Sequence, residues 1–201
     1  MAENVTTSVA SEPADYFLFF GLPRKLKLDA KALEQAFYRK SRELHPDRFA
    51  NASAEKQQWS LEQSSLLNDA YRTLKQPLAR TEYLLRLEGV KLAGENEKPK
   101  PPAELLEEVF ELNMQLEEMR ANRKVGEDDP QLRRDLEAAR EQFSSQLVDL
   151  DVQLEVEWAR WDASLDASGG AATEVKARMA ELLDRRRYVR NLVRDVNEAV
   201  A

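Results

Sequence analysis

The sequence predicts an all-α protein, in which an N-terminal helical hairpin is joined to a C-terminal three-helix bundle or coiled coil. Only 6 of the 201 residues are glycine and 33% are charged, a composition typical of soluble helical proteins. Apolar residues recur at steps of three and four in both halves of the chain, which is the helical period. Segments rich in proline and glycine interrupt this pattern and mark the ends of the predicted helices.

The main division falls at residues 89–102, where GVKLAGENEKPKPP places three prolines and two glycines between helical segments. We interpret this stretch as a linker or an ordered elbow. Residues 15–88 then form a first module, and residues 103–201 form a three-helix second module. Residues 1–14 have no basic start and no long apolar run, so we expect a disordered leader and not a signal or transit peptide.

The first module begins with a short helix predicted near residues 15–20 and ended by Gly21 and Pro23. A second helix is predicted over residues 29–44, with Asp29 as its N-cap. After it, His45-Pro46-Asp47 makes a turn close to unavoidable. The proline ring disfavours the helical conformation of His45, and Pro46 has no N–H to donate.

A third helix is predicted over residues 53–75, closed by Pro77, and a fourth over residues 78–88. The core face of the third helix is assigned to Leu66, Ala70, Tyr71 and Leu74. We expect Pro77, Arg80 and Tyr83 to hold the fourth helix against the C-terminal bundle.

Breaks at residues 126–130 and 168–172 divide the second module into three long helices. Their apolar residues alternate steps of three and four, as in an antiparallel bundle. No strand and no internal repeat is expected. The predicted core stripes are Leu105, Val109, Leu112, Leu116 and Met119; Leu132, Leu136, Ala139, Phe143, Leu147, Leu150 and Leu154; and Val175, Met179, Leu182, Val189, Val193, Val196 and Val200.

The composition excludes much enzyme chemistry. The chain has no cysteine and a single histidine, so disulfides, thiolate nucleophiles and ordinary zinc or iron–sulfur ligation by this chain are ruled out. We therefore expect no cofactor and no bound metal. The net charge of -7 argues against nucleic acid and anionic membranes as partners. No apolar span is long enough for a bilayer, so we expect a cytoplasmic protein. We also expect it to be a monomer.

Motifs in the first module resemble a known family. LHPDRF follows a helix reading ALEQAFYRKSREL and precedes one ending in LLNDAYRTLKQP, as in J-domains, which stimulate ATP hydrolysis by DnaK-type chaperones. The segments DYFLFFGLP and QPLARTEYLL narrow the resemblance to the HscB family, the J-domain co-chaperones of iron–sulfur cluster assembly. The sequence lacks the cysteine-rich zinc segment at the N-terminus of animal and plant members, so it resembles the bacterial form.

The second predicted helix and its turn are positively charged in an acidic chain. Residues 24–48 contain eight basic and four acidic side chains, which gives +4 and leaves -11 for the rest of the total of -7. Such a helix steers toward an acidic partner surface, although a merely solvated helix face is the alternative. The resemblance implies that the DnaK-type chaperone, HscA, is contacted by His45, Pro46, Asp47, Arg39, Lys40, Arg42 and Arg48.

Two other roles are open to His45: a general base, or a turn histidine with a purely structural role. The general base is disfavoured, because no nucleophile motif accompanies it and because Asp47 would need a strained turn to act as its orienting acid.

The helix that follows residue 104 has more apolar residues than its core stripe requires. Leu106, Phe110 and Met114 form a second stripe about 140° from the core stripe. Glutamates 107, 111, 117 and 118 lie around this stripe, and no basic residue occurs between Glu104 and Met119. The stripe is either a docking face for a basic, partly apolar protein or a surface covered by the long third helix or by the first module.

The resemblance implies that this stripe binds the cluster scaffold, IscU, through Leu106, Phe110, Glu111 and Met114, with Tyr188 as an aromatic contact from the last helix. The sequence departs from the family at Glu107, where an apolar residue is expected, and at Met114, where an acid is expected. Arg185, Arg186 and Arg187 are expected to pair with acidic residues of neighbouring helices.

The resulting hypothesis is a co-chaperone without a catalytic site, which delivers an IscU-type scaffold to HscA and stimulates the ATPase activity of HscA. The alternatives are a general J-protein that serves other clients and a structural helical adaptor.

Overall fold

The computed structural model describes residues 15–92, 103–165 and 171–201. Every regular element in these residues is an α-helix or a short 3-10 helix, which confirms the predicted all-α class. The described residues up to Arg80 form one compact unit and those from Thr81 onward form a second. The leader, most of the linker and part of the last predicted break lie outside the described residues.

The first unit begins with α1 (Tyr16–Phe20), whose ends follow from local chemistry. The Asp15 carboxylate accepts hydrogen bonds from the backbone N–H groups of Phe17 and Leu18, at 2.9 and 3.2 Å. Gly21 ends the helix with a φ of 67°, a conformation that favours glycine. Phe17 and Phe20 are buried, so this short helix contributes large side chains to the core of the unit.

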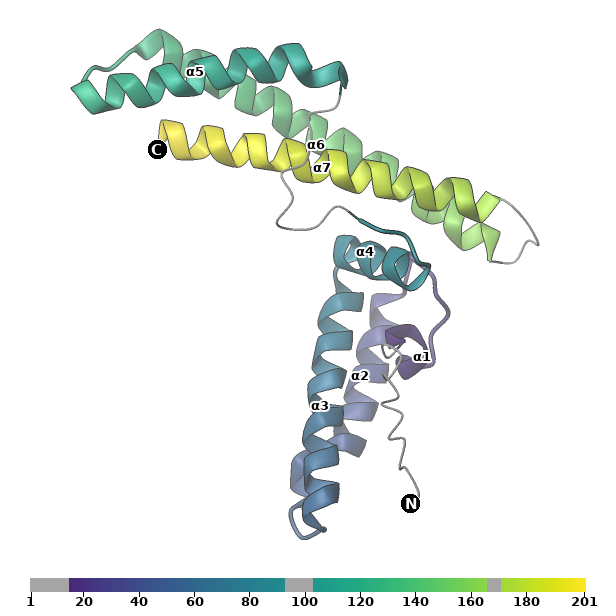
Figure 1. The fold of residues 1–201 in the computed structure, drawn as a ribbon. Helices are drawn as coiled ribbons and strands as arrows, with labels where there is room; N and C mark the ends of the chain where they lie inside the picture. Colours follow the sequence, from purple (N-terminus) through teal and green to yellow (C-terminus); the bar gives the residue numbers. More distant parts are fainter. Residues whose placement is uncertain (1–14, 93–102, 166–170) are drawn as a thin grey trace, which may run out of the picture. The chain divides into compact units, whose positions relative to one another are not determined.

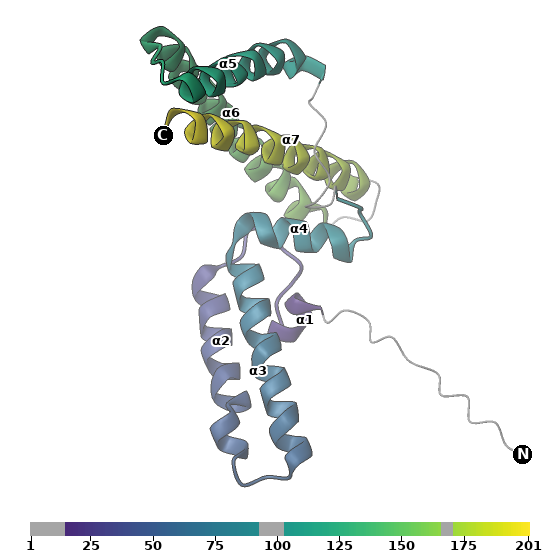
Figure 2. The same ribbon diagram turned by 60° about the vertical axis from the view of Figure 1, so that its left-hand side comes forward.

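Helices α2 (Ala30–Leu44) and α3 (Ala54–Lys75) lie side by side as an antiparallel hairpin (Figures 1 and 2). The 3-10 helix η1 (Pro46–Phe49) begins the connection between them. Asp29 caps α2 by accepting from the Lys31 N–H at 2.9 Å, as predicted. Leu33 and Ala36 of α2 face the core, as do Leu67, Ala70 and Leu74 of α3. Leu67 is more deeply buried than the predicted Leu66, which is only half-buried.

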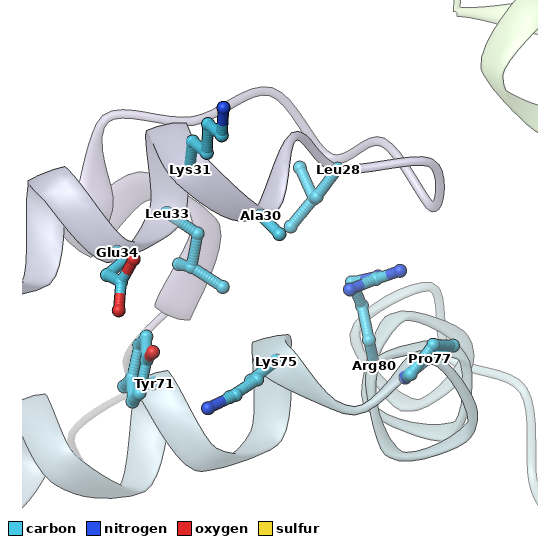
Figure 3. Close-up of a pocket in the computed structure, with 9 residues that line it drawn as sticks. All are labelled: Leu28, Ala30, Lys31, Leu33, Glu34, Tyr71, Lys75, Pro77 and Arg80. Carbon is cyan, nitrogen blue, oxygen red and sulfur yellow. The ribbon is translucent and has the colours of Figure 1, made fainter.

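Helix α4 (Pro77–Leu87) contains the boundary between the two units, and Pro77 is its first residue. The buried Arg80 donates through Nη1 to the Leu74 carbonyl and through Nη2 to the Leu26 carbonyl, the latter at 2.6 Å. It also borders a cavity of about 280 Å³ with Tyr71 and Lys75 (Figure 3). These bonds lie within the first unit. That Pro77, Arg80 and Tyr83 hold α4 against the C-terminal bundle stays a prediction.

The second unit contains η2 (Ala103–Leu105) and three long helices, α5 (Leu106–Val125), α6 (Pro130–Ser164) and α7 (Ala171–Val200). Contacts between the helices show in which direction each helix runs relative to its neighbours. Glu108 meets Gln146, and Arg186 meets Asp151, while Arg133 reaches the carbonyl of Val200. Helix α6 therefore runs antiparallel to both α5 and α7, which gives the predicted up-down-up bundle.

The predicted stripe of α5 is buried throughout. On α6 and α7 the core differs in detail from the prediction. Ala139, Leu147, Val193 and Val200 are only half-buried, whereas Leu183, Leu192 and Ala199 are buried although they were not assigned to the core. The core face of α7 is wider than a single seam because α7 packs against both α5 and α6.

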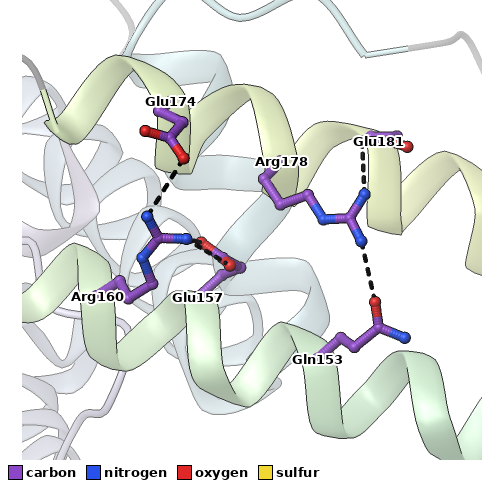
Figure 4. A network of polar contacts seen from close by, with 6 residues as sticks. All are labelled: Gln153, Glu157, Arg160, Glu174, Arg178 and Glu181. Atoms are coloured by element: carbon purple, nitrogen blue, oxygen red, sulfur yellow. Dashed lines mark hydrogen bonds and ion pairs between the residues drawn. The ribbon is translucent and has the colours of Figure 1, made fainter.

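Polar contacts along the α6 and α7 surfaces supplement this core. Arg160 pairs with Glu157 at 3.0 Å and with Glu174 at 3.4 Å, and Arg178 bonds to Glu181 and Gln153 (Figure 4). Trp158 and Trp161 lie on the buried side of α6, as expected for packing residues. None of the described helices is long and apolar enough to cross a membrane.

Candidate functional site: two partner-binding surfaces

The first candidate surface is the turn at the end of α2. We call it the turn surface and define it by His45, Pro46 and Asp47 with the cations Arg39, Lys40, Arg42 and Arg48. Helix α2 stops at Leu44, because the residue before a proline avoids the helical region. His45 accordingly has φ of -58° and ψ of 129°. The Arg48 N–H then donates to the His45 carbonyl at 3.0 Å and starts η1.

His45 and Asp47 face one another across this turn. The Asp47 backbone N–H points to His45 Nδ1 at 3.3 Å, and one Asp47 carboxylate oxygen lies 3.5 Å from the same nitrogen. The His45 side chain is 54% exposed and the Asp47 side chain 90% exposed. Both groups can therefore be reached by a partner.

The turn brings the Asp47 carboxylate near His45 without a strained backbone. No described residue other than glycine has a positive φ, and the carboxylate still comes within 3.5 Å. This geometry does not orient a general base, because the nitrogen nearest Asp47 already accepts the backbone N–H. It has no proton to donate to the carboxylate while it does so.

The four cations differ in what they contact. Arg39 and Arg42 are exposed, and neither side chain forms an ion pair with another described residue. Lys40 is half-buried, with its Nζ 4.7 Å from the centre of the Phe19 ring. The Arg48 guanidinium donates to the Arg42 carbonyl at 3.1 Å, so it helps to shape the turn. Arg39 and Arg42 thus remain the cations most available to an acidic surface.

Residues of α3 that were not predicted as functional also shape this turn. The hydroxyls of Ser60 and Ser64 both donate to the Leu44 carbonyl, at 2.7 and 3.0 Å. The Gln57 side-chain amide donates to the carbonyls of Ala50 and Ala52. The sequence signal was a pair of serines four residues apart, near the start of the buried face of α3.

The second candidate surface is the apolar strip, formed by Leu106, Phe110 and Met114 on α5. Their exposed fractions are 53%, 68% and 58%. The strip is thus separate from the buried seam of the same helix. Helices α6 and α7 leave it uncovered, so the alternative in which the long helices of the second module bury it was wrong.

Acidic side chains border the apolar strip, as the sequence indicated. Glu107, Glu111, Glu117 and Glu118 are all exposed. On the side toward α6, Glu108, Glu111 and Asp135 line a groove of about 430 Å³ between α5 and α6. The surface therefore combines exposed apolar area with negative charge.

Tyr188 of α7 lies on a face of that helix that meets α5. Three residues before it, Arg185 pairs with Glu104 at 2.6 Å. Seven residues after it, Asp195 lines a small cavity with Met119 and Arg123 of α5. Residues at these spacings share one helix face. Partial burial raises the pKa of the Tyr188 phenol above its ordinary value, and the Asp195 carboxylate adds to this effect.

The three neighbouring arginines of α7 pair with acids, as expected. Arg185 contacts Glu104, Arg186 contacts Asp151 at 2.6 Å, and Arg187 lies 3.9 Å from Glu82. Across residues 15–92, 103–165 and 171–201, no cluster of three or more acidic or histidine side chains is arranged to hold a metal ion.

A basic helix and a His-Pro-Asp turn closed by an antiparallel partner helix define a J-domain type of module, here followed by a three-helix bundle. Two solved structures resemble this chain over most of its length. The chain is similar to the chaperone HscB from Vibrio cholerae, with 26% identity and a TM-score of 0.60, over 92% of this chain and 96% of that one. Human co-chaperone HscB has the same fold, with 23% identity, a TM-score of 0.59 and coverage of 93% and 83%. No family model matches the chain.

These likenesses confirm the resemblance to HscB that the motifs indicated. They cover 92% and 93% of this chain, so they extend over both units.

Proposed function

We propose that this chain is a J-domain co-chaperone of iron–sulfur cluster assembly, which binds an IscU-type scaffold, delivers it to the DnaK-type chaperone HscA and stimulates the ATPase activity of HscA. In this proposal residues 15–88 act as the J-domain and residues 103–201 bind the scaffold. The chain works in the cytoplasm as a monomer, and the ATP chemistry is the chaperone's. The main support is one observation: a cationic turn and an acid-bordered apolar strip are exposed on separate units of a chain similar to HscB along its length.

The turn surface acts on the chaperone through polar contacts. The exposed Asp47 carboxylate offers an acceptor for an arginine of the partner, and such charge-assisted bonds are among the stronger ones. Arg39 and Arg42 bring a complementary acidic surface close and increase the association rate. Stimulation follows if these contacts are stronger in the hydrolysis-competent conformation of the chaperone, because a ligand shifts an equilibrium only by its differential affinity.

The apolar strip acts on the scaffold by a different mechanism. Phe110 is the largest and most exposed side chain of the strip, and aromatic anchors provide much of the affinity of protein interfaces. Leu106 and Met114 extend the apolar area along α5, and Glu111 attracts basic side chains at the border. Tyr188 contributes an amphipathic ring from α7.

The test is steady-state ATP turnover by the cognate chaperone with this chain alone, with the scaffold alone and with both. The proposal expects stimulation by the chain and a larger stimulation by the two proteins together. Equal stimulation with an unrelated client in place of the scaffold would instead indicate a general J-protein. No stimulation under any condition would indicate a structural adaptor and would contradict the proposal.

A further inference from the structure

The carbonyl groups at the end of α2 lack their usual backbone donors. In an α-helix the carbonyl of residue i accepts from the N–H of residue i+4. For Arg42 that residue is Pro46, which has no N–H. For Leu44 it is Arg48, whose N–H donates to the His45 carbonyl instead. The carbonyls of Arg42 and Leu44 are therefore among the acceptors that the turn leaves without their usual backbone donors.

Side chains supply these missing donors. The Arg48 guanidinium donates to the Arg42 carbonyl at 3.1 Å. The Leu44 carbonyl accepts two hydroxyl bonds from α3, at 2.7 Å from Ser60 and 3.0 Å from Ser64. Ser60 is completely buried and Ser64 half-buried. A carbonyl oxygen has two lone pairs, so both hydroxyls can bond to it at once.

The Leu44 carbonyl belongs to the peptide bond that leads directly into His45. Fixing this peptide plane fixes the backbone direction in which the His45 side chain leaves the helix. Ser60 and Ser64 lie 16 and 20 residues away in sequence, so they tie the turn to a neighbouring helix. The other contacts that hold this region lie further from the Leu44 carbonyl: the local bonds of the turn, the Gln57 contacts with the loop and the edge-to-face packing of Phe49 on Trp59.

We propose that Ser60 and Ser64 are positioning residues, whose hydroxyls hold His45 and Asp47 in the orientation that the chaperone recognises. This inference rests on the proposed function, since it assigns these hydroxyls a role in chaperone binding by the turn surface. Neither serine needs to touch the chaperone. Their effect is to raise the fraction of molecules in which the turn is already in its binding conformation.

This mechanism predicts a particular kinetic change. When only a fraction of a protein is binding-competent, its apparent dissociation constant rises in inverse proportion to that fraction. Saturating amounts of the protein still produce the full effect. Removing both hydroxyls should therefore raise the concentration needed for half-maximal ATPase stimulation by about tenfold, given the usual net value of two such hydrogen bonds. The maximal stimulation should be unchanged.

The experiment compares the full chain with its S60A/S64A variant. Chaperone ATPase activity is measured against co-chaperone concentration, and amide hydrogen exchange is measured at Asp47, Arg48 and Ala50. We expect a higher half-maximal concentration, an unchanged maximum and faster exchange at these three amides. Ser144→Ala is the matched control, because the Ser144 hydroxyl also donates to a helix carbonyl, that of Arg140 on α6. Ser144→Ala should change neither the ATPase stimulation curve nor the amide exchange at the turn.

Two further variants keep the test decisive. If S60A/S64A does not fold, the single variants S64A and S64T replace it; S64T retains the hydroxyl and should behave as the original chain, while S64A should show a smaller shift. Unchanged half-maximal concentration, unchanged amide exchange or a reduced maximum would each overturn the inference. If the unmodified chain does not stimulate the ATPase, the proposed function fails, while the exchange data still show whether the hydroxyls hold the turn.

Discussion

The turn surface and the apolar strip are produced in different ways. The turn surface depends on backbone geometry, since a proline ends α2 and side chains from α3 and Arg48 satisfy the carbonyls left without partners. The apolar strip lies on the uninterrupted helix α5, where the identity of three exposed side chains makes the surface. A single change should therefore abolish function at the turn, whereas changes at the strip should weaken binding in proportion to the area lost.

His45→Gln provides the largest expected effect. Glutamine introduces a flexible amide in place of the imidazole and so lacks the ring nitrogen that accepts the Asp47 N–H. ATPase stimulation should fall to the basal rate, while the circular dichroism spectrum and scaffold affinity remain unchanged. Normal stimulation by this variant would show that the turn surface does not act on the chaperone.

Simultaneous replacement of Phe110 and Tyr188 by alanine should weaken scaffold binding by about 2 kcal/mol or more, roughly thirtyfold, if both rings are buried anchors. Isothermal titration calorimetry measures the change, and ATPase stimulation without scaffold should be normal. Val148→Ala with Val152→Ala is the matched control, since these exposed α6 side chains lie outside the strip. Equal affinities for the original chain and F110A/Y188A would mean that the scaffold does not use this surface.

Charge reversal at Arg39 and Arg42 tests the electrostatic part of the turn surface. Their replacement by glutamate should lower the association rate with the chaperone by about tenfold at low salt, and the difference should shrink as salt is added. Stopped-flow kinetics measures the rate. Reversal of the exposed Arg134 and Arg190 in the second unit changes the net charge equally, so a similar loss there would indicate a general charge effect.

Tyr188→Phe should have the smallest effect. The ring remains, so scaffold affinity at neutral pH should hardly change. Because the folded-state pKa of Tyr188 is raised, the neutral phenol contributes stability that is complete below the unfolded value of about 10 and is lost as pH rises through the folded value. Urea unfolding at pH 7 and about pH 11 should show a smaller loss of stability at high pH in the phenylalanine variant.

Several structural features were predictable from the sequence because they depend on neighbours a few residues apart. Asp15 and Asp29 cap the helices that follow them, and Gly21 ends α1. Pro46 ends α2 because its ring disfavours the helical conformation of the preceding residue, His45. The separation of core stripe and apolar strip on α5 was also predictable, because both follow from the helical period and the solvated side carries a border of glutamates.

Features that depend on distant partners were missed or misassigned. No local pattern indicated that the Arg80 guanidinium bonds to the Leu26 carbonyl, 54 residues away in sequence. Ser60 and Ser64 carry no motif, and their role appears only when α3 is packed beside the end of α2. Leu183 and Leu192 lie off the predicted seam and are buried because α7 has two neighbouring helices.

The sequence by itself determined the helices, their ends, the position of the turn and the two faces of α5, since backbone sterics, capping and helical periodicity act over a few residues. Only the tertiary structure decided which side chains donate to the Leu44 carbonyl and which residues of α7 are buried. A buried polar group bonds to any suitable partner that the fold brings within a few ångströms, and an apolar side chain packs against whichever neighbours surround it. Neither kind of partner needs to be close in sequence.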